Sequence, residues 1–424
     1  MADAAPDQPA AHPPKADGAG AGGGAAGGRG APLTPPPLSL YVHLPWCVRK
    51  CPYCDFNSHP LRGELPVSEY IEALLADFTQ DAALVRGRTI RTVFFGGGTP
   101  SLFPPDAIAR MLDAVREKID CAADLEVTLE ANPGTVEHGR FRDYRDAGVN
   151  RLSIGVQSFE RRHLVTLGRI HDERAAHAAI EEALAAGFEN FNVVLMYGLP
   201  GQTPDEAVAD VTTACAHAPA HVSHYQLTLE PGTPFHRTPP ALPDEDACAA
   251  MQVETAAALR DAGYAQYEVS AWTRPGRECA HNLNYWTFGD YLGIGAGAHA
   301  KLTLGSCIRR THKRQQPRAY IAAAHGPGRI EGEREVGPRE AAFEFMLNAL
   351  RLPRGFSEAD FEARTGCGLA LIASTVSDAI DSGLLEAVAG GWRPTALGLR
   401  FLNDLQAMFL PEAAGSGALA GSST

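Results

Sequence analysis

The chain has 424 residues, of which 45% are hydrophobic, and a formal net charge of −13 at pH 7. This length predicts two or more domains with an ample core, and the acidic balance excludes general nucleic-acid binding, which needs a basic face. No stretch approaches the roughly 20 consecutive apolar residues of a membrane span, so at most peripheral membrane contact is expected. Nine cysteines, an odd number, in a chain that shows no export signal predict a cytoplasmic protein with reduced thiols.

Short apolar runs alternate with segments of helical periodicity along the first part of the chain. Residues 1–37, rich in Ala, Gly and Pro, are predicted to be a disordered tail, and residues 411–424 a second one. Six strands, each followed by a helical segment, are predicted within residues 38–265, at 38–43, 92–95, 125–130, 151–157, 191–196 and 222–229. This alternation predicts an α/β fold with a parallel sheet, and six repeats favour a partial (β/α)6 TIM-like barrel.

The pattern changes towards the carboxyl end. Residues 266–335 are predicted to be a connecting segment that is loop-rich from Cys279 to Lys301, and its basic run at 309–314 is interpreted as a solvated loop. Residues 336–410 are predicted to form a separate small domain, in which Ser357 caps a helix. Its other predicted elements are helices at 341–350, 369–382 and 396–409 and a hairpin at 384–388 and 391–394. Helices with one hairpin indicate a winged-helix-like α+β fold, for which we expect a packing or lid role.

Three cysteines, Cys47, Cys51 and Cys54, follow the first predicted strand at spacing C-x3-C-x2-C. Thiolates suit iron–sulfur clusters and zinc. A [4Fe–4S] cluster normally takes four thiolates, so three would leave one iron with an open position for a substrate or cofactor. The alternatives are structural zinc, which usually takes two close pairs of ligands, and three unrelated thiols. The other six cysteines are scattered, so the spacing favours a cluster.

Polar and glycine-rich motifs follow the other predicted strands, where barrel enzymes carry their chemistry. The glycines of 96–100 allow close backbone approach to a ligand, or form a tight turn. Glu130 could accept hydrogen bonds from ribose hydroxyls or an amine, or be a surface acid. Arg169, beyond Gln157, could pair with a ligand carboxylate or form a weak surface salt bridge. The common placement of these motifs predicts one shared site.

A second concentration of unusual residues is His281-Asn282-Leu283-Asn284-Tyr285-Trp286. A histidine can ligate haem iron, and Tyr285 and Trp286 can stack on a porphyrin plane. The alternative is a buried, hydrogen-bonded histidine with two core aromatics. On these residues alone the alternative is favoured.

The cysteine spacing resembles that of the radical S-adenosylmethionine (SAM) superfamily. The runs 41–58, 96–100, 150–159, 197–203 and 391–409 together resemble the family of oxygen-independent coproporphyrinogen III oxidases and the closely similar haem chaperone HemW. This resemblance covers residues 38–410 and implies a partial (β/α)6 barrel with an added C-terminal domain. It also implies that Cys47, Cys51 and Cys54 hold a [4Fe–4S] cluster whose unique iron is chelated by SAM. The residues that it places around SAM are Tyr41, Gly97, Gly98, Thr99, Glu130, Gln157 and Arg169.

Two departures from the family pattern carry information. An aspartate is expected shortly before the Tyr197–Pro200 motif, but the chain has Val194 there, which removes one polar contact to the sulfonium ligand or to a second SAM. The true oxidases carry a further cysteine two residues after the third, where this chain has Phe56.

Phe56 and the H-N-x-x-Y-W motif both resemble the chaperone branch, in which that motif is associated with haem binding. The resemblance thus implies haem binding by His281, Asn282, Tyr285 and Trp286. The expected function is a haem chaperone that binds haem as cargo, together with a [4Fe–4S] cluster and SAM, and delivers haem to acceptor apoproteins. The alternative is an oxygen-independent coproporphyrinogen III oxidase that makes protoporphyrinogen IX by radical decarboxylation, in which the cofactors carry the hard chemistry.

Overall fold

The structure is a computed structural model and describes residues 33–134 and 140–411. Most of the predicted N-terminal tail and residues 412–424 of the second tail therefore lie outside the described residues. Residues 33–37, which the prediction assigned to the tail, contact the fold. The backbone N–H of Leu33 donates to the carbonyl of Gly305 at 2.9 Å, and the carbonyl of Pro37 accepts from the N–H of Asp290 at 3.0 Å.

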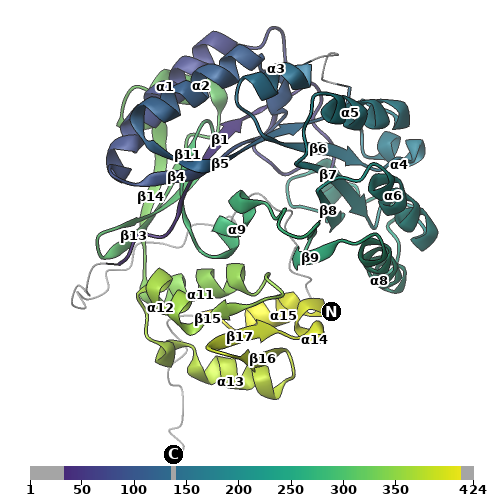
Figure 1. Cartoon of the computed structure of the whole chain (residues 1–424), viewed down its shortest axis with the longest axis vertical. Coiled ribbons are helices and arrows are strands. Elements are labelled where there is room, and N and C mark those ends of the chain that lie inside the picture. Colours follow the sequence, from purple (N-terminus) through teal and green to yellow (C-terminus); the bar gives the residue numbers. More distant parts are fainter. Residues whose placement is uncertain (1–32, 135–139, 412–424) are drawn as a thin grey trace, which may run out of the picture.

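One twelve-stranded sheet dominates the fold and curves into an arch (Figure 1). Seven parallel strands form its centre in the order β11-β1-β4-β5-β6-β7-β8. Their bounds are β1 (Leu38–Leu44), β4 (Thr89–Gly97), β5 (Asp120–Ala131), β6 (Arg151–Gln157), β7 (Phe191–Tyr197), β8 (His221–Gln226) and β11 (Asp290–Ile294). The two ends of the sheet do not pair with each other, so the predicted partial barrel is confirmed as an open one.

Antiparallel strands extend both edges of the sheet. Beyond β8 lie β10 (Ala271–Thr273) and β9 (Ala265–Glu268). Beyond β11 lie β12 (His299–Leu304), β13 (Cys307–Lys313) and β14 (Ile330–Val336). These strands widen the arch at its two edges without closing it (Figure 1).

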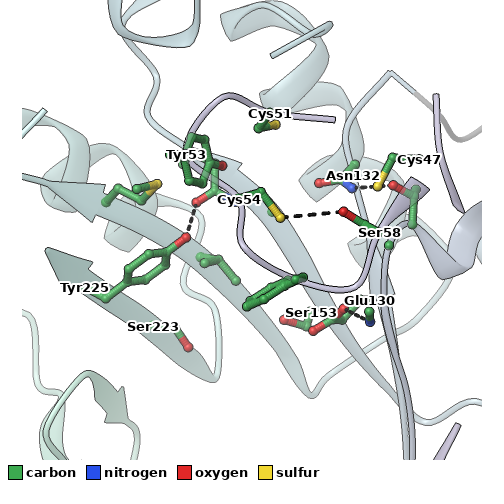
Figure 2. A pocket seen from close by; sticks show the side chains of 18 of the residues that line it. Cys47, Cys51, Tyr53, Cys54, Ser58, Glu130, Asn132, Ser153, Ser223 and Tyr225 are labelled. Carbon is green, nitrogen blue, oxygen red and sulfur yellow. Dashed lines mark hydrogen bonds between the residues drawn. The ribbon is translucent and has the colours of Figure 1, made fainter. Parts of the chain in front are cut away.

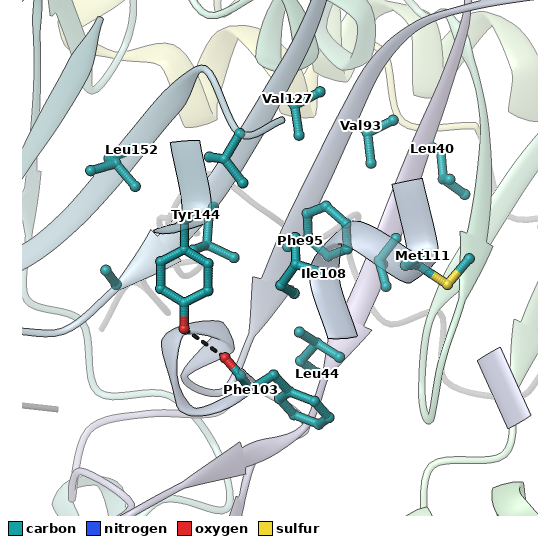
Figure 3. Close-up of a cluster of buried hydrophobic side chains, with 14 of the residues drawn as sticks. Leu40, Leu44, Val93, Phe95, Phe103, Ile108, Met111, Val127, Tyr144 and Leu152 are labelled. Atoms are coloured by element: carbon teal, nitrogen blue, oxygen red, sulfur yellow. Dashed lines mark hydrogen bonds between the residues drawn. The ribbon is translucent and has the colours of Figure 1, made fainter. Parts of the chain in front are cut away.

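The helices cover the outer side of the arch (Figure 1). Because side chains alternate across a strand, one set of strand positions packs against these helices and the other faces inward. Figure 3 shows the packed set: Leu40, Val93, Val127 and Leu152 come from four neighbouring strands and belong to the same hydrophobic cluster as Met111 of α2. Burial of each large apolar side chain stabilises the fold by about 1.5–3 kcal/mol. The covering helices are α1 (Val67–Ala82), α2 (Pro105–Lys118), α3 (Arg140–Asp146), α4 (Arg161–Thr166), α5 (Glu173–Ala185), α6 (Pro204–Ala216) and α8 (Glu245–Asp261).

The segment predicted to be loop-rich from Cys279 to Lys301 is largely regular, so this prediction was wrong. It contains helix α9 (Ala280–Trp286), all of β11 and the start of β12. Strand β11 pairs with β1 in parallel, with Leu40 opposite Leu292. Helix α9 lies on the concave side of the arch, between the sheet and the C-terminal domain (Figure 1).

The basic run at 309–314 is not a solvated loop either, because most of it belongs to β13. Arg310 pairs with Glu344 through nitrogen–oxygen distances of 2.7–2.9 Å. Lys313 is fully buried and contacts Asp77 at 2.5 Å and Asp81 at 2.6 Å, both on α1. Buried charges require such partners, and here the partners come from distant parts of the sequence.

The C-terminal part has a hydrophobic cluster of its own, which includes Phe345, Phe361, Leu385 and Leu405. The predicted hairpin is present as β16 (Leu385–Val388) and β17 (Gly391–Pro394). The predicted cap is present as well, since Ser357 Oγ accepts from the N–H of Asp360 at 3.0 Å. The remaining elements are α11 (Pro338–Ala349), β15 (Phe356–Ser357), α12 (Glu358–Thr365), α13 (Ala373–Asp381), α14 (Ala396–Arg400) and α15 (Leu402–Ala407).

Two predicted helices of this part are broken in the structure. The predicted helix at 369–382 begins with a separate 3₁₀ turn at Leu369–Leu371, and the one at 396–409 divides at Phe401 into α14 and α15. In the ranges that the structure describes, no helix is long and apolar enough to cross a membrane.

Candidate functional site

A pocket lies on the inner face of the sheet, at the carboxyl ends of the parallel strands (Figure 2). Residues of the cysteine loop and of β4, β5, β6, β7 and β8 line this pocket. Nine of the ten residues predicted to hold the cluster or SAM line it, and Tyr41 is the exception. The nine are Cys47, Cys51, Cys54, Gly97, Gly98, Thr99, Glu130, Gln157 and Arg169.

The cysteine loop is held at both ends by backbone hydrogen bonds. The short strands β2 (Trp46–Cys47) and β3 (His59–Pro60) pair in parallel, with Cys47 opposite Pro60. Inside the loop, the N–H of Cys54 donates to the carbonyl of Cys51 at 3.2 Å. The loop between the two strands therefore carries all three cysteines on a closed segment of backbone.

All three cysteines are free thiols. Burial raises the pKa of Cys47 and raises that of Cys54 to about 11. Figure 2 shows Cys54 pointing towards Ser58, with Sγ and Oγ 3.7 Å apart. Among the described residues, no three His, Cys, Asp or Glu side chains gather closely enough to hold one metal ion. A [4Fe–4S] cluster takes one thiolate for each iron, whereas a zinc ion gathers its ligands around a single atom.

The glycine motif at residues 96–100, at the end of β4, contacts the backbone that precedes the cysteine loop. The N–H of Gly98 donates to the carbonyl of Leu44 at 2.9 Å, and the N–H of Thr99 donates to the carbonyl of Trp46 at 2.8 Å. A Cβ on Gly98 would lie only 2.5 Å from that Trp46 oxygen. Glycine at 98 is thus required by a close approach to the protein's own backbone at Trp46, whereas the alternatives left open by the sequence were an approach to a ligand and a tight turn.

Glu130 is half-buried beside this motif, lines the pocket, and accepts a hydrogen bond from the N–H of Gly97 at 3.1 Å. Burial raises the pKa of Glu130 to about 7. The alternative of a surface acid is therefore wrong. A carboxylate in this position can accept hydrogen bonds from a ligand in the pocket.

Arg169 reaches the cysteine loop through a chain of polar contacts. Its Nη1 lies 3.7 Å from Cys51 Sγ, and its Nη2 donates to the carbonyl of Gly155 at 2.7 Å and to Asn132 Oδ1. Asn132 in turn donates from Nδ2 to Thr99 Oγ1 at 3.0 Å. Arg169 is therefore a half-buried part of the site and not a surface salt bridge.

Gln157 stands at the end of β6 with a positive φ of 70°, a conformation that is uncommon for residues other than glycine. Its Oε1 accepts from the hydroxyl of Tyr225 at 3.2 Å. Val194, at the position where the resemblance led us to expect an aspartate, also lines the pocket. An aspartate at this position would therefore have belonged to the site.

Tyr41 lies beneath the pocket wall and supports the loop through His43. The ring of Tyr41 stacks on Phe94 with centroids 6.2 Å apart. His43 Nε2 donates to the carbonyl of Asn57 at 2.9 Å, so Nδ1 accepts from the Tyr41 hydroxyl at 3.0 Å. Asn57 also donates to the carbonyl of Ala296 at 2.9 Å, which ties the cysteine loop to the segment after β11.

His281 is buried under the pocket and both of its ring nitrogens are engaged. Thr92 donates its hydroxyl proton to Ser39, so His281 Nδ1 donates to Thr92 Oγ1 at 2.7 Å. His281 Nε2 therefore accepts from the hydroxyl of Tyr285 at 3.1 Å. The ring also stacks on Phe94 with centroids 4.9 Å apart. This is the buried, hydrogen-bonded histidine that was the alternative interpretation of the motif.

The rest of the H-N-x-x-Y-W motif points in different directions. Asn282 lines the pocket, whereas Trp286 is covered by the guanidinium of Arg351, 4.3 Å from the ring centroid. Arg351 also donates to Glu268 at 3.0 Å. In this structure the motif therefore forms the floor of the pocket and part of the contact with the C-terminal domain.

Sequence reasoning missed several residues of the site. Asn132 and Tyr225 make hydrogen bonds to predicted site residues, and Arg151 lines the inner end of the pocket. The motif Glu130-Ala131-Asn132-Pro133 was recognised at a strand end, but only its glutamate was given a role. No sequence signal marks Arg151, which is the first residue of a strand.

Comparison with known proteins identifies two regions. Residues 41–214 match the family model described as the radical SAM superfamily, and residues 336–401 match the HemN C-terminal domain. Among solved structures, the coproporphyrinogen III oxidase HemN from Escherichia coli, a radical SAM enzyme, has a TM-score of 0.75 at 24% sequence identity. That likeness covers 88% of this chain and 90% of HemN, and it shows a shared fold.

Several curated relatives match over nearly their whole length. The haem chaperone HemW of Escherichia coli (strain K12) is 48% identical over 378 residues, which are 89% of this chain and 99% of the relative. The HemW of Haemophilus influenzae is 44% identical over 382 residues, with coverages of 89% and 99%. That of Bacillus subtilis (strain 168) is 33% identical over 381 residues, with coverages of 88% and 99%. The chain therefore belongs to the HemW family of the radical SAM superfamily.

Proposed function

We propose that this protein is a cytoplasmic haem chaperone that binds haem, holds a [4Fe–4S] cluster with SAM, and delivers the haem to acceptor apoproteins. The observation that carries the proposal is the near full-length identity of 48% to a relative named as a haem chaperone. The pocket supports it, because nine of the ten residues expected to hold the cluster and SAM line one cavity.

In this proposal Cys47, Cys51 and Cys54 hold the cluster. The three free thiols lie on one closed loop, and the guanidinium of Arg169 beside Cys51 offsets part of the negative charge of the thiolates. No other cysteine lines the pocket among the described residues, which leaves one iron for SAM. When bound, such a cluster supplies electrons to the sulfonium of SAM.

The neighbouring residues would orient SAM by the chemistry that each presents. Gly97 and Gly98 line the pocket, and the space that their side chains would take is filled by His43 and by the backbone of Trp46. Glu130 accepts hydrogen bonds from hydroxyls or from an amine, and Arg169 can pair with a carboxylate. Tyr41, Thr99 and Gln157 are given no separate contact with SAM in this proposal. They shape and support the cavity in which SAM would bind.

The haem site is proposed to involve the segment from His281 to Trp286. Ligation of iron by His281 requires Nε2 to exchange its hydrogen bond from Tyr285 for the metal, because that lone pair is occupied in this structure. Asn282 already faces the pocket. The proposal therefore predicts a rearrangement of α9 when haem binds.

The alternative, coproporphyrinogen III oxidase activity, is not favoured. Phe56 lines the pocket where the oxidases carry a further cysteine, and Val194 lines it where the family carries an aspartate. The anaerobically reconstituted protein should bind haem in a titration and should not convert coproporphyrinogen III to protoporphyrinogen IX. Robust turnover without haem binding would reverse this choice.

The cluster assignment has its own test. Alanine at Cys47, Cys51 or Cys54 should abolish the iron–sulfur absorbance of the reconstituted protein, because each thiolate binds one iron. Alanine at Cys121 or Cys367, which lie outside the pocket, should leave it intact. Equal loss in both sets of variants would refute the assignment.

A further inference from the structure

A buried arginine stands at the inner end of the pocket. Arg151 begins β6 and is 2% exposed, yet it lines the pocket together with Ser153, Gly155 and Gln157. Alternate residues of a strand share one face, so these four side-chain positions form a single row on the inner face of β6. Arg151 is the deepest member of the row.

The guanidinium of Arg151 lacks a partner of the kind that a buried charge needs. Its one hydrogen bond within the described residues is a 3.5 Å contact from Nη1 to Thr128 Oγ1, and its buried Nε has no partner. No carboxylate of the described chain lies within 4.0 Å of its nitrogens. A guanidinium is always protonated, and burial of an unpaired charge is strongly unfavourable.

The nearby acid Glu126 makes its hydrogen bonds to other groups than Arg151. Glu126 accepts hydrogen bonds from the backbone N–H groups of Ala280 and His281, each at 3.0 Å, and from Cys279 Sγ at 3.5 Å. The pocket floor thus keeps a fixed positive charge without a directly bound anion.

Arg151 lies too deep to share the ligand group expected at the cluster. Arg169 bonds to the carbonyl of Gly155 and contacts Cys51, so Gly155 marks the level of the cysteine loop. Arg151 is four residues earlier, which is about 13 Å along the strand at roughly 3.3 Å per residue. Ser153, Asn192, Ser223 and Asn282 line the pocket around this deeper region. The guanidinium stays at this depth, because its Nη1 lies beside Thr128, the residue that is paired with Arg151 across the sheet.

We propose that Arg151 binds the carboxylate of a second ligand group that enters the pocket past the cysteine loop. A guanidinium pairs strongly with a carboxylate through parallel N–H···O bonds, and Nε and Nη2 of Arg151 make no hydrogen bond in the described part of the chain. Two sources carry this chemistry: a propionate of haem, and the amino-acid carboxylate of a second SAM. The first source rests on the proposed haem function, and the second does not.

The test compares Arg151→Met with Arg151→Lys, and with Arg142→Met as a control at an exposed arginine on α3. Anaerobic absorbance titrations would measure the affinity for haem and for haem dimethyl ester, which lacks the carboxylates. Equilibrium dialysis would measure the number of SAM molecules bound per chain. The melting temperature of the ligand-free protein reports any purely structural role of Arg151.

If haem is the source, Arg151→Met weakens haem binding about tenfold to a hundredfold, the range for a hydrogen bond to a charged group. The wild type then discriminates against the dimethyl ester by a similar factor, and Arg151→Lys recovers part of the loss. If SAM is the source, Arg151→Met lowers the SAM stoichiometry by one. In both cases the ligand-free melting temperature stays unchanged or rises, because an uncompensated buried charge has been removed.

Unchanged haem affinity together with unchanged SAM stoichiometry in Arg151→Met would overturn the inference. A lower ligand-free melting temperature with loss of the cluster would also overturn it, because Arg151 would then be a structural residue. If the wild type binds no haem, the proposed function is contradicted. The number of SAM molecules bound per chain by the wild type and by Arg151→Met then tests the inference without haem.

Discussion

Gly98→Ala is expected to damage the cluster site without touching a cluster ligand. The new Cβ would lie 2.5 Å from the carbonyl oxygen of Trp46, while ordinary contact begins at 3.4 Å. The backbone that leads into Cys47 must therefore move by roughly 0.9 Å, the difference between these two distances. Because the obstacle is backbone, no side-chain rotation can relieve the overlap. Overpacking of this kind costs about 1–3 kcal/mol.

The assay is the iron and sulfide content per chain after anaerobic reconstitution, together with the free energy of unfolding. Gly98→Ala should lower both. Gly368→Ala is the matched control, because its Cβ would meet nothing within 4 Å and its φ is −72°. If Gly98→Ala held as much iron and sulfide as the control, the close approach of the glycine motif to the cysteine loop would have no part in building the site.

Three further predictions use charge and hydrogen bonding. Because the pKa of Glu130 is raised to about 7, only about a tenth of the Glu130 side chains are ionised at pH 6. The affinity for SAM should therefore rise up to about tenfold from pH 6 to pH 8, and Glu130→Gln should remove this dependence on pH. A steep profile in the variant would contradict this. Burial raises the pKa of Asp210 to about 6, from about 3.9 in the unfolded chain. As the pH rises from 4 to 7, the free energy of unfolding of the wild type should therefore fall relative to that of Asp210→Asn, by up to about 3 kcal/mol in urea unfolding. If the difference between the two proteins stayed constant with pH, Asp210 would already be ionised in the folded protein at pH 4. His281→Ala should weaken haem binding and alter the Soret band with the cluster intact, whereas Tyr285→Phe, which frees Nε2, should not weaken it; equal spectra in wild type and His281→Ala would leave the motif as a packed floor.

The alternation of strands and helices was predictable because it depends on local periodicity. β6 has the predicted bounds, Arg151–Gln157, since an apolar residue at every second position is visible in the sequence itself. β11 was missed because Gly293, Gly295 and Gly297 make this stretch look like a loop, and only its pairing with β1 makes it a strand of the main sheet. The basic run was misread because Asp77, which neutralises Lys313, lies 236 residues away.

The site shows the same division. The cysteine spacing is a local signal, and the SAM residues came from a resemblance between motifs. The state of His281 depends on Thr92, which is 189 residues away, and on its position under the pocket. Arg151 stands out only because its guanidinium is buried without a carboxylate partner, and no sequence pattern can show which partner a side chain lacks.

Haem transfer tests the central claim most directly. The reconstituted protein would be loaded with one haem per chain and mixed anaerobically with a haem-free acceptor apoprotein, and the absorbance spectrum and separated fractions would show where the haem resides. The account predicts that haem binds to this protein and then moves to the acceptor, without any conversion of coproporphyrinogen III. A protein that binds no haem, or that keeps its haem and instead turns over coproporphyrinogen III, would contradict it.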